Sequence, residues 1–114
     1  MSPSRVLIVR TSALGDIVHT LPLATALRRH LPAARIGWVV EQRFAPLLAN
    51  HPAVDVVLEV ALKDWRREPF ARSSWRQLLG FLDQLAAFAP DVVIDAMSNH
   101  KSALLAALSL ADLR

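Results

Sequence analysis

Short runs of β-branched and other apolar residues alternate along this chain with segments that have helical spacing. Four such runs, at residues 5–9, 35–40, 54–60 and 91–95, have the length and apolar character of buried parallel strands. Parallel strands need long crossover connections, which helices between consecutive strands provide. The order therefore predicts one α/β domain, built as a parallel sheet with helices on both of its faces.

The first helix is expected to begin near Asp16 and to end before Pro32. Pro22 lies inside this segment and either bends the helix or starts a second one at its first helical position. The apolar positions of the segment share one face at helical spacing: Ile17, Leu21, Ala24 and Leu27. A further short helical stretch is expected over residues 41–49.

A longer helix is expected after the third strand. The segment from Ser74 to Gln77 has the form of a capping box, in which two side chains satisfy amide groups at a helix start. From there six apolar residues form one stripe at helical spacing: Trp75, Leu78, Leu79, Leu82, Leu85 and Ala86. Pro90 ends this helix, and a last helix is expected over residues 101–113.

Composition excludes several classes of protein. With 54% hydrophobic and 20% charged residues, the chain of 114 residues has too much apolar surface to be intrinsically disordered. It has no cysteine, which excludes disulfides and thiolate zinc sites, and its histidines show no metal-ligand spacing, so no metal is expected. No apolar run reaches the ~18 residues that span a bilayer, and the first residues do not resemble a signal peptide. We therefore expect a cytoplasmic location.

The net charge of +3 is concentrated in one segment, residues 60–76. A local basic patch indicates an anionic partner at one place on the surface and not a nucleic acid. The alternative is that an arginine-rich composition clusters these side chains by chance and that they pair with neighbouring carboxylates. The charged residues of the segment are Lys63, Arg66, Arg67, Arg72 and Arg76, with Asp64 and Glu68.

The loop after the first strand is the segment best suited to chemistry. Residues 11–16 provide two hydroxyl groups, a glycine for close backbone approach and a carboxylate at a helix N-terminus. Asp16 either caps the helix or acts as a general base. A helix N-terminus lowers the pKa of a carboxyl group and weakens it as a base, whereas desolvation by a bound substrate raises it.

Ligands of parallel α/β sheets bind at the carboxyl ends of the strands. If the first and fourth strands are neighbours, the loops at residues 11–16 and 95–101 meet in one crevice. Other common site patterns are missing from the sequence: the glycine fingerprint of dinucleotide-binding domains, the Gly-Lys-Ser/Thr phosphate loop and the Gly-x-Ser-x-Gly nucleophile elbow.

The pattern Ser-x-x-Gly-Asp-x-x-His-x-x-Pro, which runs from Ser12 to Pro22, resembles the N-terminus of the lipopolysaccharide heptosyltransferases of glycosyltransferase family 9. The similarity covers essentially the whole chain and continues through Trp38–Glu41, Ala61–Arg67, Val93–Ala96 and Lys101–Ala103. The resemblance implies that residues 1–114 form the N-terminal, acceptor-binding, Rossmann-like domain of an inverting transferase of GT-B architecture. The C-terminal donor-binding domain of that architecture is absent from this chain.

The resemblance further implies transfer of heptose from ADP-heptose to a Kdo–lipid A acceptor at the cytoplasmic membrane surface, with no metal or other cofactor. It makes Asp16 the catalytic base, whereas Ser12 and Gly15 shape the acceptor loop. The basic residues that match those suited to acceptor anions are Lys63, Arg66, Arg67 and Lys101. Trp65 lies among them, with core packing as its alternative role. By itself the chain is expected to be inactive.

Two positions depart from the family pattern. Asp64 stands where the family carries another cation, and residues 96–100 replace its Gln-Gly-Leu-like sequence, which leaves the role of the loop from Met97 to His100 open. Two other functions stay open beside heptosyl transfer. One is a related GT-B transferase or epimerase that uses another sugar nucleotide, and the other is a glycolipid-binding module without catalysis. Turnover of the donor separates these possibilities, and the sequence leaves the oligomeric state undetermined.

Overall fold

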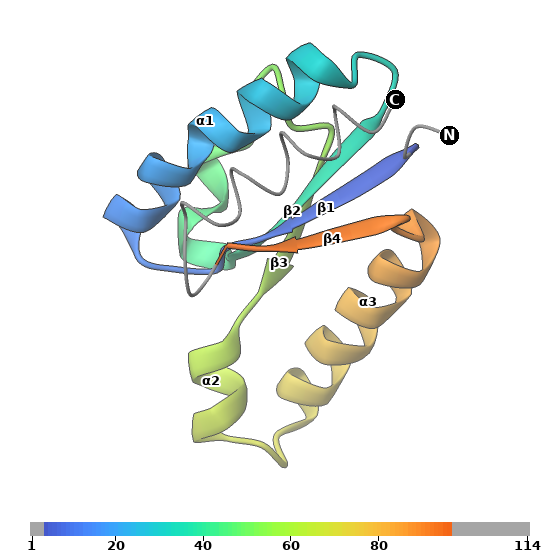
Figure 1. Ribbon diagram of the computed structural model, residues 1–114. Helices are drawn as coiled ribbons and strands as arrows, with labels where there is room; N and C mark the ends of the chain where they lie inside the picture. The colour runs from blue at the N-terminus through green and yellow to red at the C-terminus, as the bar shows by residue number, and fades with distance from the viewer. Residues whose placement is uncertain (1–3, 97–114) are drawn as a thin grey trace.

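The computed structural model describes residues 4–96, which form a four-stranded parallel sheet with helices on both faces (Figure 1). The strands are β1 (Arg5–Val9), β2 (Arg35–Glu41), β3 (Val56–Val60) and β4 (Val92–Asp95), in the sheet order β3-β2-β1-β4. The helices are α1 (Leu14–His30), the 3-10 helix η1 (Gln42–Leu47), α2 (Leu62–Arg67) and α3 (Arg72–Phe88). The predicted fold class is confirmed.

The strand order bears directly on the predicted crevice. β1 pairs with β4 in parallel register, with Val6 opposite Val92 and Val9 opposite Asp95. The first and fourth strands are therefore neighbours, as the convergence of their following loops requires. The rest of the fourth loop, from Met97 to His100, and the helix predicted over residues 101–113 lie outside the described residues.

The sheet is buried on both faces, and β1 shows how. Val6 and Ile8 belong to the core that α1 covers, whereas Leu7 belongs to the core on the side of α3. Side chains alternate between the two faces of a strand, so a continuous apolar run can serve both cores. Gly37 in β2 admits the end of α3, because a Cβ atom there would lie 3.0 Å from Cζ of Phe88.

Helix α1 is one continuous helix, so the predicted start of a second helix at Pro22 is wrong. Pro22 lies inside α1 on its exposed side. Since proline lacks an N–H group, it cannot donate the usual bond to the carbonyl of Val18. That carbonyl is on the solvent side of the helix, because Val18 is also exposed, and water can satisfy it there.

The predicted start of the long helix is also wrong. Helix α3 begins at Arg72, and its N-cap residue, Ala71, makes no side-chain capping bond. Ser74 therefore lies inside the helix, where it is buried. The capping-box pattern fails because the helix starts three residues earlier than an N-cap at Ser74 would place it.

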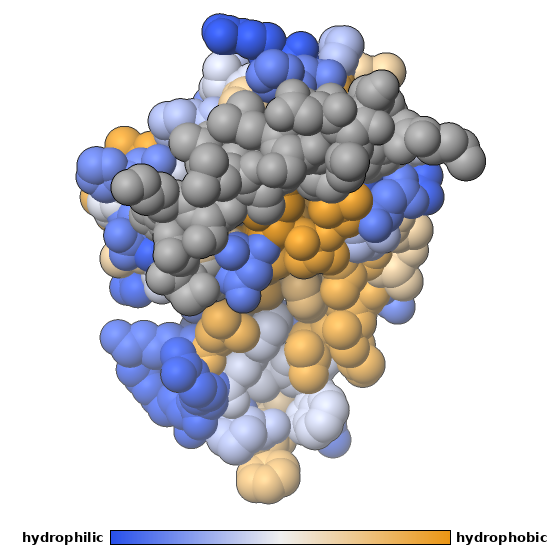
Figure 2. Space-filling model, viewed as in Figure 1, coloured by the Kyte–Doolittle hydropathy of each residue, from blue (hydrophilic) through white to orange (hydrophobic). Residues whose placement is uncertain are grey.

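The apolar stripe predicted for α3 does not coincide with its buried face. Leu78 and Leu85 are partly buried, but Trp75, Leu79 and Leu82 are 52%, 56% and 46% exposed. The buried or partly buried residues of α3 are Ser74, Leu78, Phe81, Leu85 and Phe88, of which Phe81, Leu85 and Phe88 pack in the core with the sheet. Figure 2 shows the resulting apolar area on the surface over α3 and β4.

The remaining boundaries differ by a few residues from the predicted ones. β2 extends one residue further than predicted, to Glu41, and the predicted helix over residues 41–49 is the shorter 3-10 helix η1. β3 begins at Val56, two residues later than predicted. Its start is displaced because Asp55, the residue before it, accepts a hydrogen bond of 2.7 Å from the Ile36 amide and pairs with Arg28.

Candidate functional site

The carboxyl ends of the strands bring three connecting segments to one edge of the sheet. The Glu41 amide, at the end of β2, donates to the Thr11 carbonyl over 3.0 Å, and the Glu41 carboxylate accepts from the Leu62 amide over 3.1 Å. The Ala96 amide donates to the Val9 carbonyl over 3.0 Å. The loop after β1, the start of α2 and the end of β4 therefore form one connected edge (Figure 1).

Asp16 lies in the first turn of α1 at this edge. The N-cap position belongs to Ala13, which makes no side-chain capping bond, so the predicted role of Asp16 as the helix cap is wrong. Its carboxylate instead forms an ion pair with the guanidinium of Arg10, and its side chain is 49% exposed. The carboxylate is thus fixed by a cation on one side and accessible to a ligand on the other.

Arg10 is the residue that holds this carboxylate. Its side chain is only 7% exposed, and its Nη1 donates to the Ala96 carbonyl over 2.9 Å. Its own carbonyl accepts a hydrogen bond of 3.0 Å from the indole of Trp38, which is fully buried. Arg10 therefore connects the loop after β1 to the end of β4.

Arg10 was not among the site residues predicted from the sequence. A signal for it was present, because a charged residue that directly follows an apolar parallel strand is placed at the binding edge of the sheet. Arg10 also precedes Asp16 by only six positions, with a short loop between β1 and α1 separating them. What the sequence did not indicate is that the guanidinium is buried and turned toward β4.

Ser12 and Gly15, the other two residues predicted for this part of the site, have fewer contacts described in the structure than Arg10. Ser12 is partly buried, and Gly15 is exposed. A Cβ atom at Gly15 would meet nothing within 4 Å, and no glycine among the described residues has a positive φ. The fold therefore does not require glycine at this position. Its predicted role in shaping an acceptor site stays a prediction.

The predicted basic residues Lys63, Arg66 and Arg67 lie on α2, where all three are exposed. Within residues 4–96 none of them forms an ion pair, so the alternative pairing with Asp64 and Glu68 is not observed. Asp64 is exposed on the same short helix.

Trp65 anchors α2 to the rest of the molecule. Its indole N–H donates to Oε1 of Gln77 over 2.9 Å, and its ring lies 6.4 Å from that of Phe81. The packing role considered for Trp65 is thus confirmed. Beside it is a hollow of about 330 Å³ between β3 and the two helices, lined in part by Glu59, Gln77 and Phe81.

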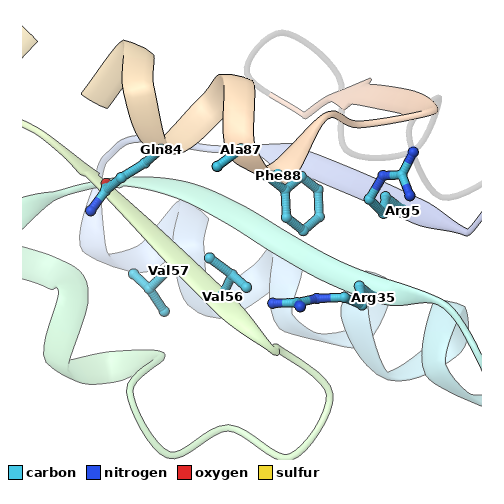
Figure 3. Close-up of a pocket in the computed structure, with 7 residues that line it drawn as sticks. All are labelled: Arg5, Arg35, Val56, Val57, Gln84, Ala87 and Phe88. Atoms are coloured by element: carbon cyan, nitrogen blue, oxygen red, sulfur yellow. The ribbon is translucent and has the colours of Figure 1, made fainter. Parts of the chain in front are cut away.

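A second hollow, of about 360 Å³, lies at the opposite end of the sheet (Figure 3). Arg5 and Arg35, the first residues of β1 and β2, line it together with Phe88. Arg5 is already paired with Asp91 and bonded to the Ala89 carbonyl. This hollow is at the amino ends of the strands and is therefore separate from the edge that carries Asp16.

Lys101, the last predicted site residue, lies outside the described residues. Among residues 4–96 no group of three or more His, Cys, Asp or Glu side chains could hold a metal ion. No helix in that part of the chain is long and apolar enough to cross a membrane.

Fold and site together define a Rossmann-like domain whose connecting segments meet at the carboxyl ends of its strands, the edge at which parallel α/β sheets bind ligands. No family model matches the chain. It is 43% identical over 104 residues to the lipopolysaccharide heptosyltransferase 1 of Pseudomonas aeruginosa, over 89% of this chain and 28% of that protein. It is 42% identical over 101 residues to the lipopolysaccharide heptosyltransferase 1 of Escherichia coli K12, over 89% of this chain and 32% of that protein.

Solved structures give the same result. The E. coli heptosyltransferase WaaC with ADP has a TM-score of 0.74 and 41% identity, over 80% of this chain and 28% of that one. The same enzyme with ADP-2-deoxy-2-fluoro heptose has a TM-score of 0.73 over 80% of this chain and 29% of that one. The chain thus spans about 30% of the length of these relatives. The predicted resemblance is confirmed, and the chain is homologous to the heptosyltransferases, which are glycosyltransferases, over the part that it spans.

Proposed function

We propose that this chain supplies the acceptor site and the catalytic base of a heptosyltransferase in lipopolysaccharide core biosynthesis. The reaction transfers heptose from ADP-heptose to Kdo–lipid A with inversion at the anomeric carbon. The observation that carries the proposal is the half-exposed Asp16 carboxylate, fixed by buried Arg10 at the carboxyl edge of the sheet. Support comes from homology to enzymes named heptosyltransferase and from neighbours that contain ADP or an ADP-heptose analogue.

In this mechanism Asp16 takes the proton from an acceptor hydroxyl group as that oxygen attacks the anomeric carbon. The new bond joins the acceptor oxygen to the sugar, and the bond to ADP breaks, so that ADP leaves with the electron pair. Asp16 must be ionised to accept the proton, and the guanidinium of Arg10 beside it holds the carboxylate in position. General bases of this kind raise rates by about 10²–10⁴-fold.

The acceptor contacts are assigned to two groups of residues. Ser12 and Gly15 belong to the loop that carries the base, so they lie where the acceptor hydroxyl must come. Lys63, Arg66 and Arg67 are exposed on α2 at the same edge and without ion-pair partners among residues 4–96. Guanidinium and ammonium groups suit the carboxylates and phosphates of a Kdo–lipid A molecule. Lys101 remains a further candidate for these anions.

Donor binding is assigned to the part of the longer heptosyltransferases that this chain does not match. No Gly-Lys-Ser/Thr phosphate loop or dinucleotide fingerprint occurs in the chain, so its own residues offer no recognised nucleotide site. The acceptor is a lipid, and we therefore place the enzyme in the cytoplasm, bound peripherally to the inner membrane. No metal or other cofactor enters the proposed reaction.

The catalytic part is tested in a chimera, in which this chain replaces the matching segment of a full-length relative. Heptosyl transfer to Kdo–lipid A is measured with the unchanged chain, with Asp16→Asn and with Asp83→Asn. Asp83 is an exposed carboxylate on α3 and serves as the matched control. We expect Asp16→Asn to lower turnover about 10²–10⁴-fold and Asp83→Asn to leave it unchanged. Near-normal turnover of Asp16→Asn refutes the assignment of the base.

The chimera also separates the alternative functions. Turnover of another sugar nucleotide in preference to ADP-heptose would assign the chain to a related transferase or epimerase. Acceptor binding without any donor turnover would leave it as a glycolipid-binding module. The isolated chain is expected to bind the acceptor but not ADP, and micromolar ADP binding in calorimetry would contradict the assignment of the donor to another domain.

The acceptor patch is tested by calorimetry of the isolated chain with a deacylated, soluble Kdo-bearing acceptor. We expect Arg66→Gln and Arg67→Gln each to weaken binding by at most about 1.5–3 kcal/mol, the range for charge-assisted hydrogen bonds. Arg29→Gln, an exposed arginine at the end of α1, is the matched control. Binding should weaken with salt, because the screening length falls from ~10 Å at 0.1 M to ~3 Å at 1 M. A salt-independent affinity refutes the acceptor patch.

A further inference from the structure

We infer that the turn between α2 and α3, with the first two turns of α3, is the surface by which the protein contacts an anionic lipid bilayer. This hairpin tip comprises residues 68–76. The inference rests on the proposed function, because an enzyme whose acceptor is a lipid works at a bilayer surface. It adds the part of the molecule that touches the lipid and the residues that do so.

The first observation is an aromatic side chain at the outermost turn. Phe70 is 89% exposed, more than any other large apolar side chain of the described residues. Trp75, which follows it within α3, is 52% exposed. Single exposed apolar residues are ordinary, but an exposed phenylalanine on a turn, followed five residues later by an exposed tryptophan, is typical of surfaces that enter the interfacial layer of a membrane.

The second observation is the charge around these rings. Arg66 and Arg67 end α2, and Arg72 and Arg76 lie in the first two turns of α3. All four are exposed and form no ion pair within residues 4–96. Such a cluster complements the negative surface of anionic lipids, and the long arginine stems allow the charge to reach the headgroups.

The third observation is that the placement of Arg72, the first residue of α3, opposes helix stability. Cations are unfavourable near a helix N-terminus, where the backbone dipole is positive, and acidic residues are favourable there. The first turn of α3 contains no acidic residue and begins with Arg72. Proteins break local rules of stability mainly at functional sites, so an unfavourably placed charge indicates a function. An anionic surface would relieve the repulsion.

The shape of the molecule agrees with this orientation. In Figure 1 the turn between α2 and α3 is the end of the molecule farthest from α1, and the two helices diverge from the sheet to reach it. Figure 2 shows a hydrophilic area over α2 next to this end. A bilayer that meets the tip can therefore also meet Lys63, Arg66 and Arg67, which the proposed function assigns to the acceptor.

Vesicle sedimentation of the unlabelled chain tests the surface. The vesicles contain phosphatidylcholine alone or with about one-third phosphatidylglycerol, and neither contains Kdo. We expect binding to the anionic vesicles only. Phe70→Ser should weaken it about tenfold, as expected for withdrawal of one aromatic ring from the interface, and Arg72→Gln and Arg76→Gln about fivefold each. Leu47→Ser and Arg29→Gln, exposed residues away from the tip, should leave it unchanged.

Tryptophan quenching by brominated lipids gives a second readout. Trp38 is fully buried, so it should not respond, whereas Trp75 should be quenched on anionic vesicles. Most of the quenching should disappear in Trp75→Phe. If Phe70→Ser binds vesicles as well as the unchanged chain, or if Trp75 is not quenched, the tip is not the contact surface. Concentration-dependent dimerisation that Phe70→Ser abolishes, without vesicle binding, overturns the inference in favour of a second copy of the chain.

The soluble acceptor distinguishes this inference from the proposed function. Phe70 is not among the assigned acceptor residues, so Phe70→Ser should bind the deacylated Kdo-bearing acceptor like the unchanged chain. If Phe70→Ser loses vesicle binding but still binds the soluble acceptor, contact with the lipid surface is a separate function of the tip. A chain that binds anionic vesicles through the tip but not the acceptor keeps this inference and refutes the acceptor assignment.

Discussion

Replacement of Arg10 by Met tests how the candidate site is held in place. The change removes the guanidinium but keeps a long apolar stem in a position that is only 7% exposed. The Ala96 carbonyl loses a donor at 2.9 Å, and the Asp16 carboxylate loses its ion-pair partner. The bond from Trp38 to the Arg10 carbonyl involves the backbone and should survive.

The expected cost follows from the exposure of each partner. Loss of the charge-assisted bond to the Ala96 carbonyl should cost about 1.5–3 kcal/mol. The pair with Asp16 adds about 0–1 kcal/mol, because that carboxylate is 49% exposed and water screens it. We therefore expect Arg10→Met to lower the free energy of unfolding by about 1.5–4 kcal/mol, whereas Asp16→Asn lowers it by less than about 1 kcal/mol.

Urea unfolding of the chain, followed by tryptophan fluorescence, measures these values. The double variant completes a mutant cycle, and its coupling energy isolates the Arg10–Asp16 pair. We expect a coupling energy below about 1 kcal/mol. If the free energy of unfolding of Arg10→Met lies within about 0.5 kcal/mol of that of the unchanged chain, Arg10 does not bridge the loop and β4. A coupling energy above about 2 kcal/mol would show that Asp16 is less accessible than its exposure indicates.

Three further predictions concern stability. Gly37→Ala should cost about 1–3 kcal/mol in urea unfolding, because its methyl group would lie 3.0 Å from an aromatic ring of α3. Arg28→Met should cost about 2–3 kcal/mol in the same assay, since its Nη1 donates to two carbonyls that close the turn after α1, the nearer at 2.7 Å. Hydrogen bonds from the Ser4 and Arg5 amides, with the Arg5 charge, lower the pKa of the Asp91 carboxyl group below its ordinary 3.8. The Asp91 carboxylate therefore stabilises the fold at a pH above 3.8, and this stabilisation is lost as the pH falls through the lowered pKa. Asp91→Asn lacks the ionisable group, so its free energy of unfolding should fall less steeply between about pH 5 and about pH 3. An equally steep fall in that variant would contradict the prediction.

The fold could be predicted from the sequence because its signals are local. Each strand is a continuous apolar run, and each crossover has helical spacing, so the parallel sheet follows without tertiary information. Helix boundaries were less predictable, as α3 shows. Ser74 matches a capping pattern, but the helix begins at Arg72, and packing of Phe81 and Phe88 against the sheet decides which face it buries. The apolar residues of α3 exceed the area the sheet can cover, so their spacing alone could not identify the buried face.

The sequence by itself determined the parallel α/β order, the position of Asp16 after the first strand and the concentration of positive charge at residues 60–76. These features depend on neighbours along the chain. Only the tertiary structure decided that Asp16 pairs with Arg10 and does not cap α1, and that Arg10 reaches the end of β4. That contact joins residues that are 86 positions apart, and it exists because β4 returns beside β1. No local pattern encodes it, since the partner of a buried charge is set by which strands the fold makes neighbours.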